Sequence, residues 1–246
     1  MLQKIQASKF PSKFLALALL LLCLLSPCAV KAQQLRIACV GNSITFGARV
    51  DNRDKESYPA VLSEMLKSND YLNYRIKNFG IGGATILRFG TPNLWPLIDS
   101  LKNFKPDIVV IKAGTNETVG KPRLNWEHID EFEKDYSDYI AEIRKVNPNC
   151  KIVICSPLDM VIQTEELSPE RITDLTGRRP RIWELRKRIK KIASTENTFF
   201  LDLTSPFKGK ANLKTKKDGV HPNKDGYQYL GSLVYDYLVK RKIVVK

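Results

Sequence analysis

Short apolar runs that alternate with longer amphipathic segments are the feature that most limits how this chain can fold. The runs are rich in Val, Ile and other apolar residues, which is typical of strands buried on both faces of a sheet. Parallel neighbours in a sheet need a crossover, and the amphipathic segments are long enough to supply it as helices. The alternation predicts an α/β fold, a three-layer α/β/α sandwich around a central five-stranded parallel sheet. The expected strands are residues 35–40, 73–79, 108–112, 151–155 and 198–203.

Between the expected strands, apolar residues recur at intervals of three and four, which predicts helices. Glycine follows the first two runs directly, as Val40-Gly41 and Phe79-Gly80, and indicates sharp turns there. Since the strands of a parallel sheet all point the same way, the loops after the first three strands should meet at one edge. The expected helices are residues 58–67, 93–103, 129–146 and 223–240, with a basic helix after an irregular segment that ends near Thr176.

The chain is basic, with a formal net charge of +14. The charge concentrates in Arg178-Arg179-Pro180-Arg181 and between Arg186 and Lys191, without the interleaved aromatic stripe of a nucleic-acid site. Apolar residues recur at helical spacing through the same segment, so the cations are interpreted as the solvated face of an amphipathic helix. Attraction to an acidic polymer remains the alternative. No nucleic-acid partner is expected.

Residues 1–32 have the three parts of a secretory signal peptide. Lysines precede an apolar run from Phe14 to Leu25, and Val30-Lys31-Ala32 offers a cleavage site before Gln33. The run is too short to favour a membrane span, so no stable membrane insertion is expected after cleavage. Residues 33–246 would then form one exported domain, periplasmic or extracellular, with a net charge of about +10 because four lysines leave with the signal peptide. A lipoprotein anchored at Cys28 is a minor alternative, which Pro27 disfavours.

Three cysteines remain in the predicted domain, namely Cys39, Cys150 and Cys155. An odd number without paired spacing does not make a disulfide framework, and buried, unreactive thiols are expected. Cys39 and Cys155 would be neighbours if their strands paired. The sequence has no zinc-ligand spacing and only two histidines, so neither a metal site nor a cofactor is expected.

Ser43 comes just after the first expected strand, at the edge where α/β folds bind their ligands. A serine hydroxyl becomes a nucleophile when a base takes its proton and a third group orients that base. His221 follows Asp218 by three residues on a glycine-containing turn, so the carboxylate can accept Nδ1–H and leave Nε2 facing outward. His128 lies at a helix start, where a solvated or capping role is expected. Taken one at a time, these residues also fit ordinary turns and helix caps.

Acyl transfer also needs hydrogen-bond donors for the oxygen that becomes negative when the carbonyl is attacked. Gly83 follows the second expected strand and can bring a bare backbone N–H close to a ligand. Asn116 follows the third and offers a side-chain amide. Because these positions and Ser43 project toward the same edge of the sheet, a joint catalytic role explains them better than unrelated turn roles.

Four segments, taken in order, resemble the four blocks of the SGNH/GDSL hydrolases. They are Gly41-Asn42-Ser43-Ile44-Thr45, the segment from Asn78 to Gly83, Gly114-Thr115-Asn116-Glu117 and Asp218-Gly219-Val220-His221. The resemblance runs from about residue 35 to residue 240 and implies the flavodoxin-like fold of that family. It implies Ser43 as nucleophile, His221 as base and Asp218 as its orienting acid. It also implies an oxyanion hole made of the Ser43 and Gly83 N–H groups and the Asn116 amide.

Two residues depart from the family pattern, since Asn42 and Glu117 both stand where the family often has aspartate. Neither position is a triad member, so activity is still expected. No Gly-x-Ser-x-Gly occurs, which argues against the α/β-hydrolase type of serine esterase. The glycines from Gly80 to Gly83 fit neither a dinucleotide fingerprint nor a P-loop.

The substrate class follows from a narrower resemblance. The segments 84–95 and 121–126 look like those of exported family members that act as carbohydrate O-acetylesterases, including sialate-type enzymes. Trp95 and Trp126 are expected to form a sugar-stacking wall or to anchor their loops, and Arg88 or Arg178 to meet a substrate carboxylate. The alternatives are a lysophospholipase or thioesterase acting on lipid esters, and a non-catalytic glycan-binding module. The sequence predicts no oligomeric state.

Overall fold

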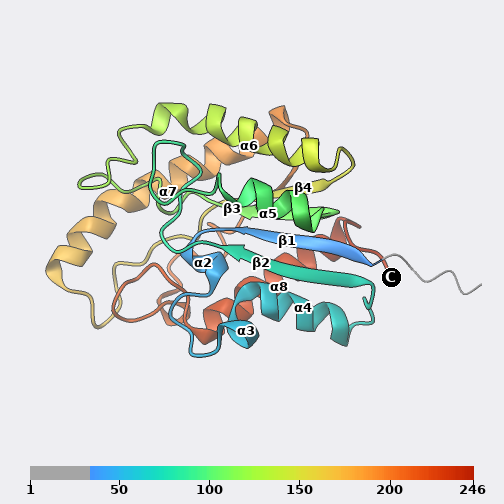
Figure 1. The fold of residues 1–246 in the computed structure, drawn as a ribbon. Coiled ribbons are helices and arrows are strands. Elements are labelled where there is room, and N and C mark those ends of the chain that lie inside the picture. Colours follow the sequence, from blue (N-terminus) through green and yellow to red (C-terminus); the bar gives the residue numbers. More distant parts are fainter. Residues whose placement is uncertain (1–33) are drawn as a thin grey trace, which may run out of the picture. The chain divides into compact units, whose positions relative to one another are not determined.

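The computed structural model describes residues 34–246, and the predicted signal peptide lies outside this range. Its centre is a five-stranded sheet in the order β2-β1-β3-β4-β5, and every neighbouring pair is parallel (Figure 1). The predicted α/β class and the parallel five-stranded sheet are therefore confirmed. The strands are β1 (Leu35–Gly41), β2 (Tyr74–Gly80), β3 (Ile108–Lys112), β4 (Lys151–Cys155) and β5 (Phe199–Leu201).

Helices cover both faces of the sheet and make the outer two layers (Figure 1). One face packs against α4 (Tyr58–Ser68) and α8 (Lys224–Lys240), and the other packs against α5 (Leu97–Phe104) and α6 (Phe132–Val146). The carboxyl-terminal half of α7 (Pro169–Thr195) joins the second group. The remaining helices are short: α2 (Ser43–Phe46), α3 (Arg53–Glu56), η1 (Ile129–Glu131) and η2 (Ala211–Leu213).

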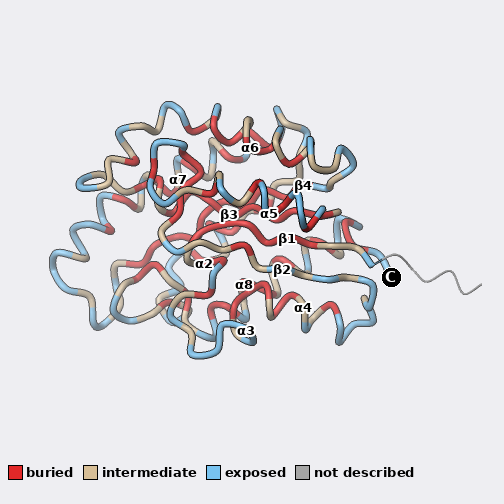
Figure 2. The backbone as a smooth tube through the Cα atoms, in the orientation of Figure 1, coloured by how far each residue is buried: buried red, intermediate tan, exposed pale blue. Residues whose placement is uncertain are grey.

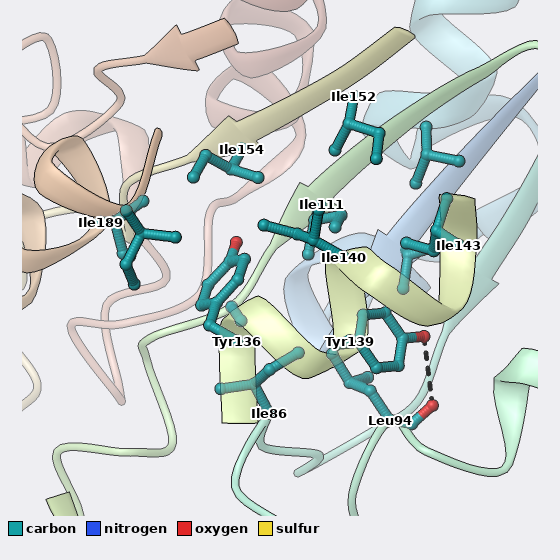
Figure 3. Close-up of a cluster of buried hydrophobic side chains, with 14 of the residues drawn as sticks. Ile86, Leu94, Ile111, Tyr136, Tyr139, Ile140, Ile143, Ile152, Ile154 and Ile189 are labelled. Carbon is teal, nitrogen blue, oxygen red and sulfur yellow. Dashed lines mark hydrogen bonds between the residues drawn. The ribbon is translucent and has the colours of Figure 1, made fainter. Parts of the chain in front are cut away.

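Apolar side chains from the central strands fill both interfaces, so buried backbone runs through the middle of the molecule and exposed backbone lies outside (Figure 2). Strand β3 is buried at every position, which explains its unbroken apolar run. On the α6 face, Ile140 and Ile143 meet Ile111 of β3 and Ile152 of β4 (Figure 3). The Tyr139 hydroxyl, buried in this cluster, donates to the Leu94 carbonyl at 3.2 Å, so it is satisfied within the core (Figure 3).

Two helices begin at least one helical turn away from the expected residue. Helix α5 begins at Leu97, not at Asn93, because the Asn93 side chain accepts from Trp95 N–H and donates to the Gly90 carbonyl, which holds a turn there. Helix α7 begins at Pro169, inside the segment expected to be irregular. Ser168 caps it by accepting from the Arg171 N–H, and Pro169 suits the first turn.

The cations of the basic helix were predicted to face solvent, and for its arginines this prediction is wrong. Arg178 is buried, Arg179 pairs with Asp159, and Arg186 pairs with Asp202. The lysines of the same helix are exposed, as expected. Burying the long arginine side chains against neighbouring segments ties α7 to the rest of the domain.

Cys39 and Cys155 are free thiols in β1 and β4, and β3 lies between those strands, so the two strands do not pair. Burial raises the pKa of both thiols to about 12. Cys150 is also free, and it is only partly buried. Within residues 34–246, none of the helices combines the length and the apolar character that crossing a bilayer requires.

Candidate active site

Ser43 lies at the carboxyl end of β1, where the chain turns sharply into the short helix α2. Asn42 caps this helix, because its side-chain oxygen accepts a hydrogen bond from the Ile44 N–H at 3.1 Å. Ser43 is the first residue of the helix, so its own N–H has no partner within α2. The turn packs on Gly80, where an added Cβ would lie 2.0 Å from the Phe46 nitrogen. A glycine at the end of β2 is therefore required for the Ser43 turn to sit where it does.

Ser43, His221 and Asp218 form one hydrogen-bonded series. The Ser43 hydroxyl lies 2.8 Å from Nε2 of His221, and the Nδ1–H of His221 donates to Oδ2 of Asp218 at 2.9 Å. Residues 178 positions apart are thus brought into contact across the carboxyl edge of the sheet. The side chains of His221 and Asp218 are 19% and 14% exposed, so the series is sheltered but open to solvent on one side. This is the arrangement that activates a serine hydroxyl.

Asp218 is held as a carboxylate. Its Oδ1 accepts from the backbone N–H groups of Val220 and His221, at 2.8 and 2.9 Å. Burial of the carboxyl opposes its ionisation, but the hydrogen bond and charge of His221 and these two N–H groups outweigh that effect, and the pKa of Asp218 is lowered well below its ordinary value. The charge that orients the His221 ring therefore persists through the mildly acidic range.

Gly83 and Asn116, the other predicted oxyanion donors, lie on adjoining loops beyond β2 and β3. Gly83 has a φ of +74°, a left-handed conformation that glycine adopts without strain. In the described part of the chain, no acceptor takes a hydrogen bond from its N–H. The Asn116 amide donates to the Ala84 carbonyl at 2.8 Å, which joins the two loops and leaves its second N–H available.

Glu117 explains how these loops stay together. It is fully buried, and its two carboxylate oxygens accept from the Ile86 N–H at 2.7 Å and the Gly114 N–H at 2.8 Å. Burial raises the pKa of this carboxyl, although both N–H groups act against the rise. The residue that departs from the family pattern thus supports the Gly83 and Asn116 loops from beneath.

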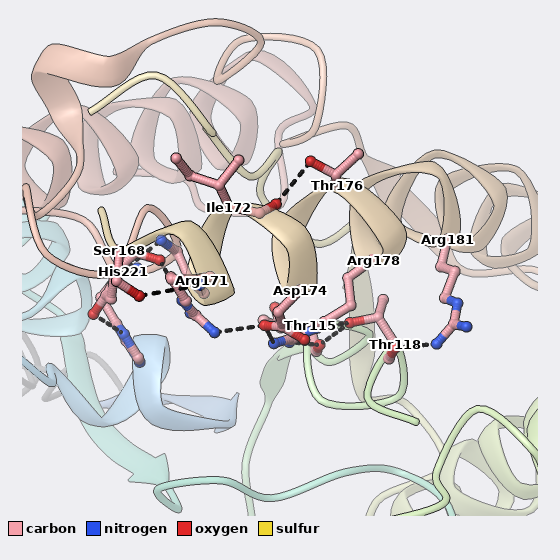
Figure 4. Close-up of polar contacts among 12 residues, drawn as sticks. Thr115, Thr118, Ser168, Arg171, Ile172, Asp174, Thr176, Arg178, Arg181 and His221 are labelled. Carbon is pink, nitrogen blue, oxygen red and sulfur yellow. Dashed lines mark hydrogen bonds and ion pairs between the residues drawn. The ribbon is translucent and has the colours of Figure 1, made fainter. Parts of the chain in front are cut away.

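Helix α7 connects the His221 turn to the Asn116 loop through side chains on successive turns (Figure 4). Arg171 donates to the Asp218 carbonyl at 3.0 Å and to Asp174 at 2.7 Å. Arg178 donates to the same Asp174 carboxylate at 3.1 Å, to the Thr118 hydroxyl at 3.0 Å and to the Thr115 carbonyl at 3.2 Å. One helix face thus bridges the two loops that carry the base and the amide.

The predicted substrate-binding side chains make contacts of their own. Arg88 is exposed and lies over the Trp95 ring, 3.3 Å from its centroid, and it pairs with Asp135 and Asp138. The indole N–H of Trp95 donates to the Ile86 carbonyl at 2.9 Å, and the ring packs against the core, so Trp95 anchors its loop. In the part of the chain that the structure describes, no hydrogen bond or ion pair joins Arg88 or Trp95 to Ser43 or His221.

Two further predicted residues are likewise held by the protein. The Trp126 ring lies 4.8 Å from the guanidinium carbon of Arg181 and is partly packed against the core. Arg178, the other candidate for a substrate carboxylate, is nearly buried, and its hydrogen bonds go to Asp174, Thr115 and Thr118. Its charge faces into the molecule.

Three arginines that the sequence did not single out lie around the Ser43 series. Arg49 lies 3.4 Å from Oδ2 of Asp218 and its side chain is 64% exposed. Arg123 donates to the Gly83 carbonyl at 2.7 Å, and Arg171 donates to the Asp218 carbonyl. The chain has many cationic residues, and no local sequence pattern distinguishes these three arginines from the others. They reach the site only because of how their loops and helix are placed in the fold. His128, as expected, lies apart, with Nδ1 3.1 Å from Glu131.

Residues 39–229 match the model of the GDSL-like Lipase/Acylhydrolase family. The chain is 30% identical over 226 residues to an acetylxylan esterase from Xylanibacter ruminicola. That alignment covers 84% of this chain and 43% of the relative, so the chain spans less than half the length of that protein.

Solved structures share the fold at low sequence identity. A lipase/acylhydrolase from Enterococcus faecalis matches with a TM-score of 0.66 and 20% identity, covering 84% of this chain and 96% of that one. A carbohydrate acetylesterase from Sinorhizobium meliloti matches with a TM-score of 0.64 and 16% identity, covering 84% and 99%. At these identities the likeness is one of fold, and it extends over nearly all of the described residues.

Proposed function

Since the chain belongs to the GDSL-like lipase/acylhydrolase family, we propose that it is a carbohydrate O-acetylesterase that uses Ser43 as its nucleophile. Membership of this family makes it a carboxylic ester hydrolase. The observation that carries the catalytic proposal is the hydrogen-bonded series from the Ser43 hydroxyl through His221 to Asp218. A serine arranged in this way can form an acyl-enzyme.

In the first half of the reaction, the Ser43 oxygen bonds to the carbonyl carbon of the ester while Nε2 of His221 takes the hydroxyl proton. The ionised Asp218 stabilises the imidazolium that forms and keeps Nδ1–H directed toward itself. The bond to the leaving sugar oxygen then breaks, and His221 returns its proton to that oxygen. The acetyl group remains on Ser43, and the sugar leaves as an alcohol.

In the second half, water attacks the acetyl-serine and gives its proton to the same Nε2 atom. The bond between the acyl carbon and the Ser43 oxygen breaks, Nε2 returns the proton to that oxygen, and acetic acid leaves and ionises to acetate in water. In each half the carbonyl oxygen becomes negative, and the N–H groups of Ser43 and Gly83 with the amide of Asn116 are the proposed donors to it.

Acetylated carbohydrate is the proposed substrate class because two of the similar proteins described above carry the name of a carbohydrate esterase. One is the acetylxylan esterase, and the other is the carbohydrate acetylesterase that shares the fold. The rival substrate class is a lipid ester, which the same serine and histidine could hydrolyse. A glycan-binding module without catalysis is the rival from another class, and the retained Ser43 series disfavours it.

The test is the release of acetate from acetylated xylan, acetylated pectin, acetylated sialic acids and acetylated monosaccharides. The same enzyme is assayed with p-nitrophenyl acetate and with p-nitrophenyl esters of longer acyl chains. We expect acetate release from at least one glycan, and we expect the Ser43→Ala variant to lose it. Activity on long-chain esters alone would reject the carbohydrate assignment, and glycan binding with no hydrolysis of any ester would reject the enzyme.

Export is a second part of the proposal, and it rests on the signal-peptide pattern of residues 1–32. Amino-terminal sequencing of the protein recovered from a secreting host tests it. We expect a mature chain that starts at Gln33. Recovery of the uncleaved chain in the cytoplasm would contradict this expectation.

A further inference from the structure

A hollow of about 400 Å³ lies on the flank of α7, and none of its lining residues is Ser43, His221 or Asp218. Its volume is within the range of ordinary small-ligand pockets. It combines an aromatic ring, apolar carbon and cationic side chains. The residues that line it are Ile162, Thr176, Arg179, Pro180, Trp183 and Lys208.

A buried carboxylate holds the aromatic part of this hollow in place. Asp159 is fully buried and accepts a hydrogen bond from the indole N–H of Trp183 at 3.0 Å. The same carboxylate accepts bidentate hydrogen bonds from the Arg179 guanidinium, the shortest at 2.8 Å. Because Asp159 fixes both side chains, the half-buried Trp183 ring is oriented before any ligand arrives.

The charge of the hollow is not balanced. Asp159 neutralises Arg179, and Asp202 neutralises Arg186, whose guanidinium carbon lies 5.8 Å from the Trp183 ring centroid. Lys208 is exposed, and its ammonium lies 5.7 Å from the same centroid. Among residues 34–246 it forms no ion pair, so one positive charge beside an oriented indole is left for a ligand.

We propose that this hollow is a secondary carbohydrate site, which binds a sugar residue that carries a carboxylate. The C–H face of the sugar ring would stack on Trp183, and the carboxylate would pair with the Lys208 ammonium. The choice of carbohydrate as ligand rests on the proposed function. The acidic substituent rests on Lys208, which is the lining cation of the hollow that no carboxylate among the described residues neutralises.

The hollow also borders the loop that carries the base. Ile162 packs against the small apolar cluster that contains Val220, and the neighbouring Val161 N–H donates to the Gly219 carbonyl at 3.0 Å. A glycan held at Trp183 would therefore be retained next to the segment from Asp218 to His221. This placement suits a polymeric substrate that is acetylated at several positions along its length.

The test is calorimetric titration of residues 33–246 with oligosaccharides that carry no acetyl group. One probe is a xylo-oligosaccharide substituted with glucuronic acid, and the other is the unsubstituted xylo-oligosaccharide of equal length. We expect saturable binding with preference for the acidic probe. Trp183→Ala should weaken that binding about tenfold or more, and Trp183→Phe, which keeps a stacking face, should weaken it less. Lys208→Gln should abolish the preference for the acidic probe.

Lys187→Gln is the matched control, because Lys187 is an exposed lysine on the same helix and does not line the hollow. Melting temperatures of all variants identify any loss of folding. Absence of binding by the wild-type chain, or equal binding by the wild-type chain and Trp183→Ala, would overturn the proposal. Stronger binding of a single-stranded oligonucleotide than of the acidic oligosaccharide would overturn it as well. Because the probes contain no ester, these outcomes are independent of acetate release.

Discussion

At the scale of single residues, the Asn116 amide has two N–H groups with different roles. One N–H of its amide is used by the Ala84 carbonyl, and the other is the proposed donor to the oxyanion. Asn116→Ala should lower kcat by roughly 10²–10³ and change KM little, since the lost interaction forms mainly in the transition state. Steady-state kinetics with p-nitrophenyl acetate measure both constants.

Asn69→Ala, an exposed asparagine at the end of α4, is the control for this experiment. Its kinetic constants should equal those of the wild type. If kcat of Asn116→Ala equals that of the wild type, Asn116 is not a donor to the oxyanion. Its role would then be the hydrogen bond to the Ala84 carbonyl.

Asp218 offers a test that depends on pH. The pKa of this carboxyl is lowered in the folded protein, so the stabilisation it contributes is present above its ordinary pKa of 3.8 and is lost only as pH falls through the lower folded value. Asp218 is therefore ionised from mildly acidic to alkaline pH. Asp218→Asn should lower kcat by roughly 10⁴ because the neutral amide no longer fixes the tautomer of His221.

The ionisation of Asp218 is checked directly by NMR, because the chemical shift of a carboxyl carbon changes when the group takes up a proton. The Asp218 signal should stay constant from alkaline to mildly acidic pH, since the pKa of this carboxyl lies well below its ordinary value. A signal that titrates in the mildly acidic range would mean that the charge of Asp218 is not held as described.

At the scale of elements, α7 is the part of the structure that aligns the two halves of the site. Arg178 contacts neither Ser43 nor His221, but it holds the loop that carries Asn116. Arg178→Met keeps much of the side-chain volume and removes these bonds. We expect a lower kcat, by about tenfold or more, since small displacements of a catalytic group have effects of this size.

A structural role alone would lower the melting temperature without changing kcat of the folded enzyme, so both quantities are measured. Lys190→Met, an exposed substitution on the same helix, controls for the change of charge. An unchanged kcat in folded Arg178→Met would show that the Asn116 loop holds its position without the hydrogen bonds of Arg178.

The sequence predicted the strands, and it predicted that Ser43, His221 and Asp218 would lie in contact, for physical reasons that differ. Strand β3 is buried throughout, so its apolar run is unmistakable, and the Asp218–His221 spacing limits how that turn can fold. The start of α7 was missed because Gly177 and Pro180 look like helix breakers, while the Ser168–Pro169 start signal stands further upstream.

The partners of the arginines could not be predicted either. Arg171, Arg178 and Arg179 are alike in sequence, but they meet Asp218, Thr118 and Asp159 through contacts that only the packed fold creates. The same holds for Arg88 and Trp95, which lie together as a stacked pair. A pattern of residue types predicts which face of a helix is apolar, whereas the partner of each charge depends on the tertiary arrangement.

At the scale of the whole molecule, two buried lysines tie stability to pH. Lys112 ends β3, and its ammonium has no hydrogen-bond partner among the described residues. Burial lowers the pKa of Lys112 to about 8, although Cys155 and Glu117 act against the shift. Burial and the charge of Lys112 lower the pKa of Lys214, which donates to the Val220 carbonyl, to about 7.

The sign of the pH effect follows from these values. The folded chain releases the two protons near pH 7 and 8, while the unfolded chain keeps them up to the ordinary lysine value of 10.5. The unfolded state therefore binds more protons over this interval, and the free energy of unfolding should rise with pH. The free energy of unfolding should stop rising as pH approaches 9.0, the ordinary thiol pKa. There the unfolded chain begins to release thiol protons that the buried Cys39 and Cys155 keep in the folded chain.

Lys112→Met tests this link, because methionine keeps an apolar stem of similar length and removes the buried charge. Urea unfolding of the wild type should give a free energy that rises on the order of 1 kcal/mol per pH unit from about pH 6.5 to about pH 8.5. The variant should be more stable than the wild type at the acidic end and should show a smaller slope, which persists in part because Lys214 still titrates. Lys187→Met, exposed on α7, should leave the slope unchanged. A wild-type free energy of unfolding that is constant or falls over this interval would contradict this expectation. It would mean that Lys112 and Lys214 are not desolvated in solution.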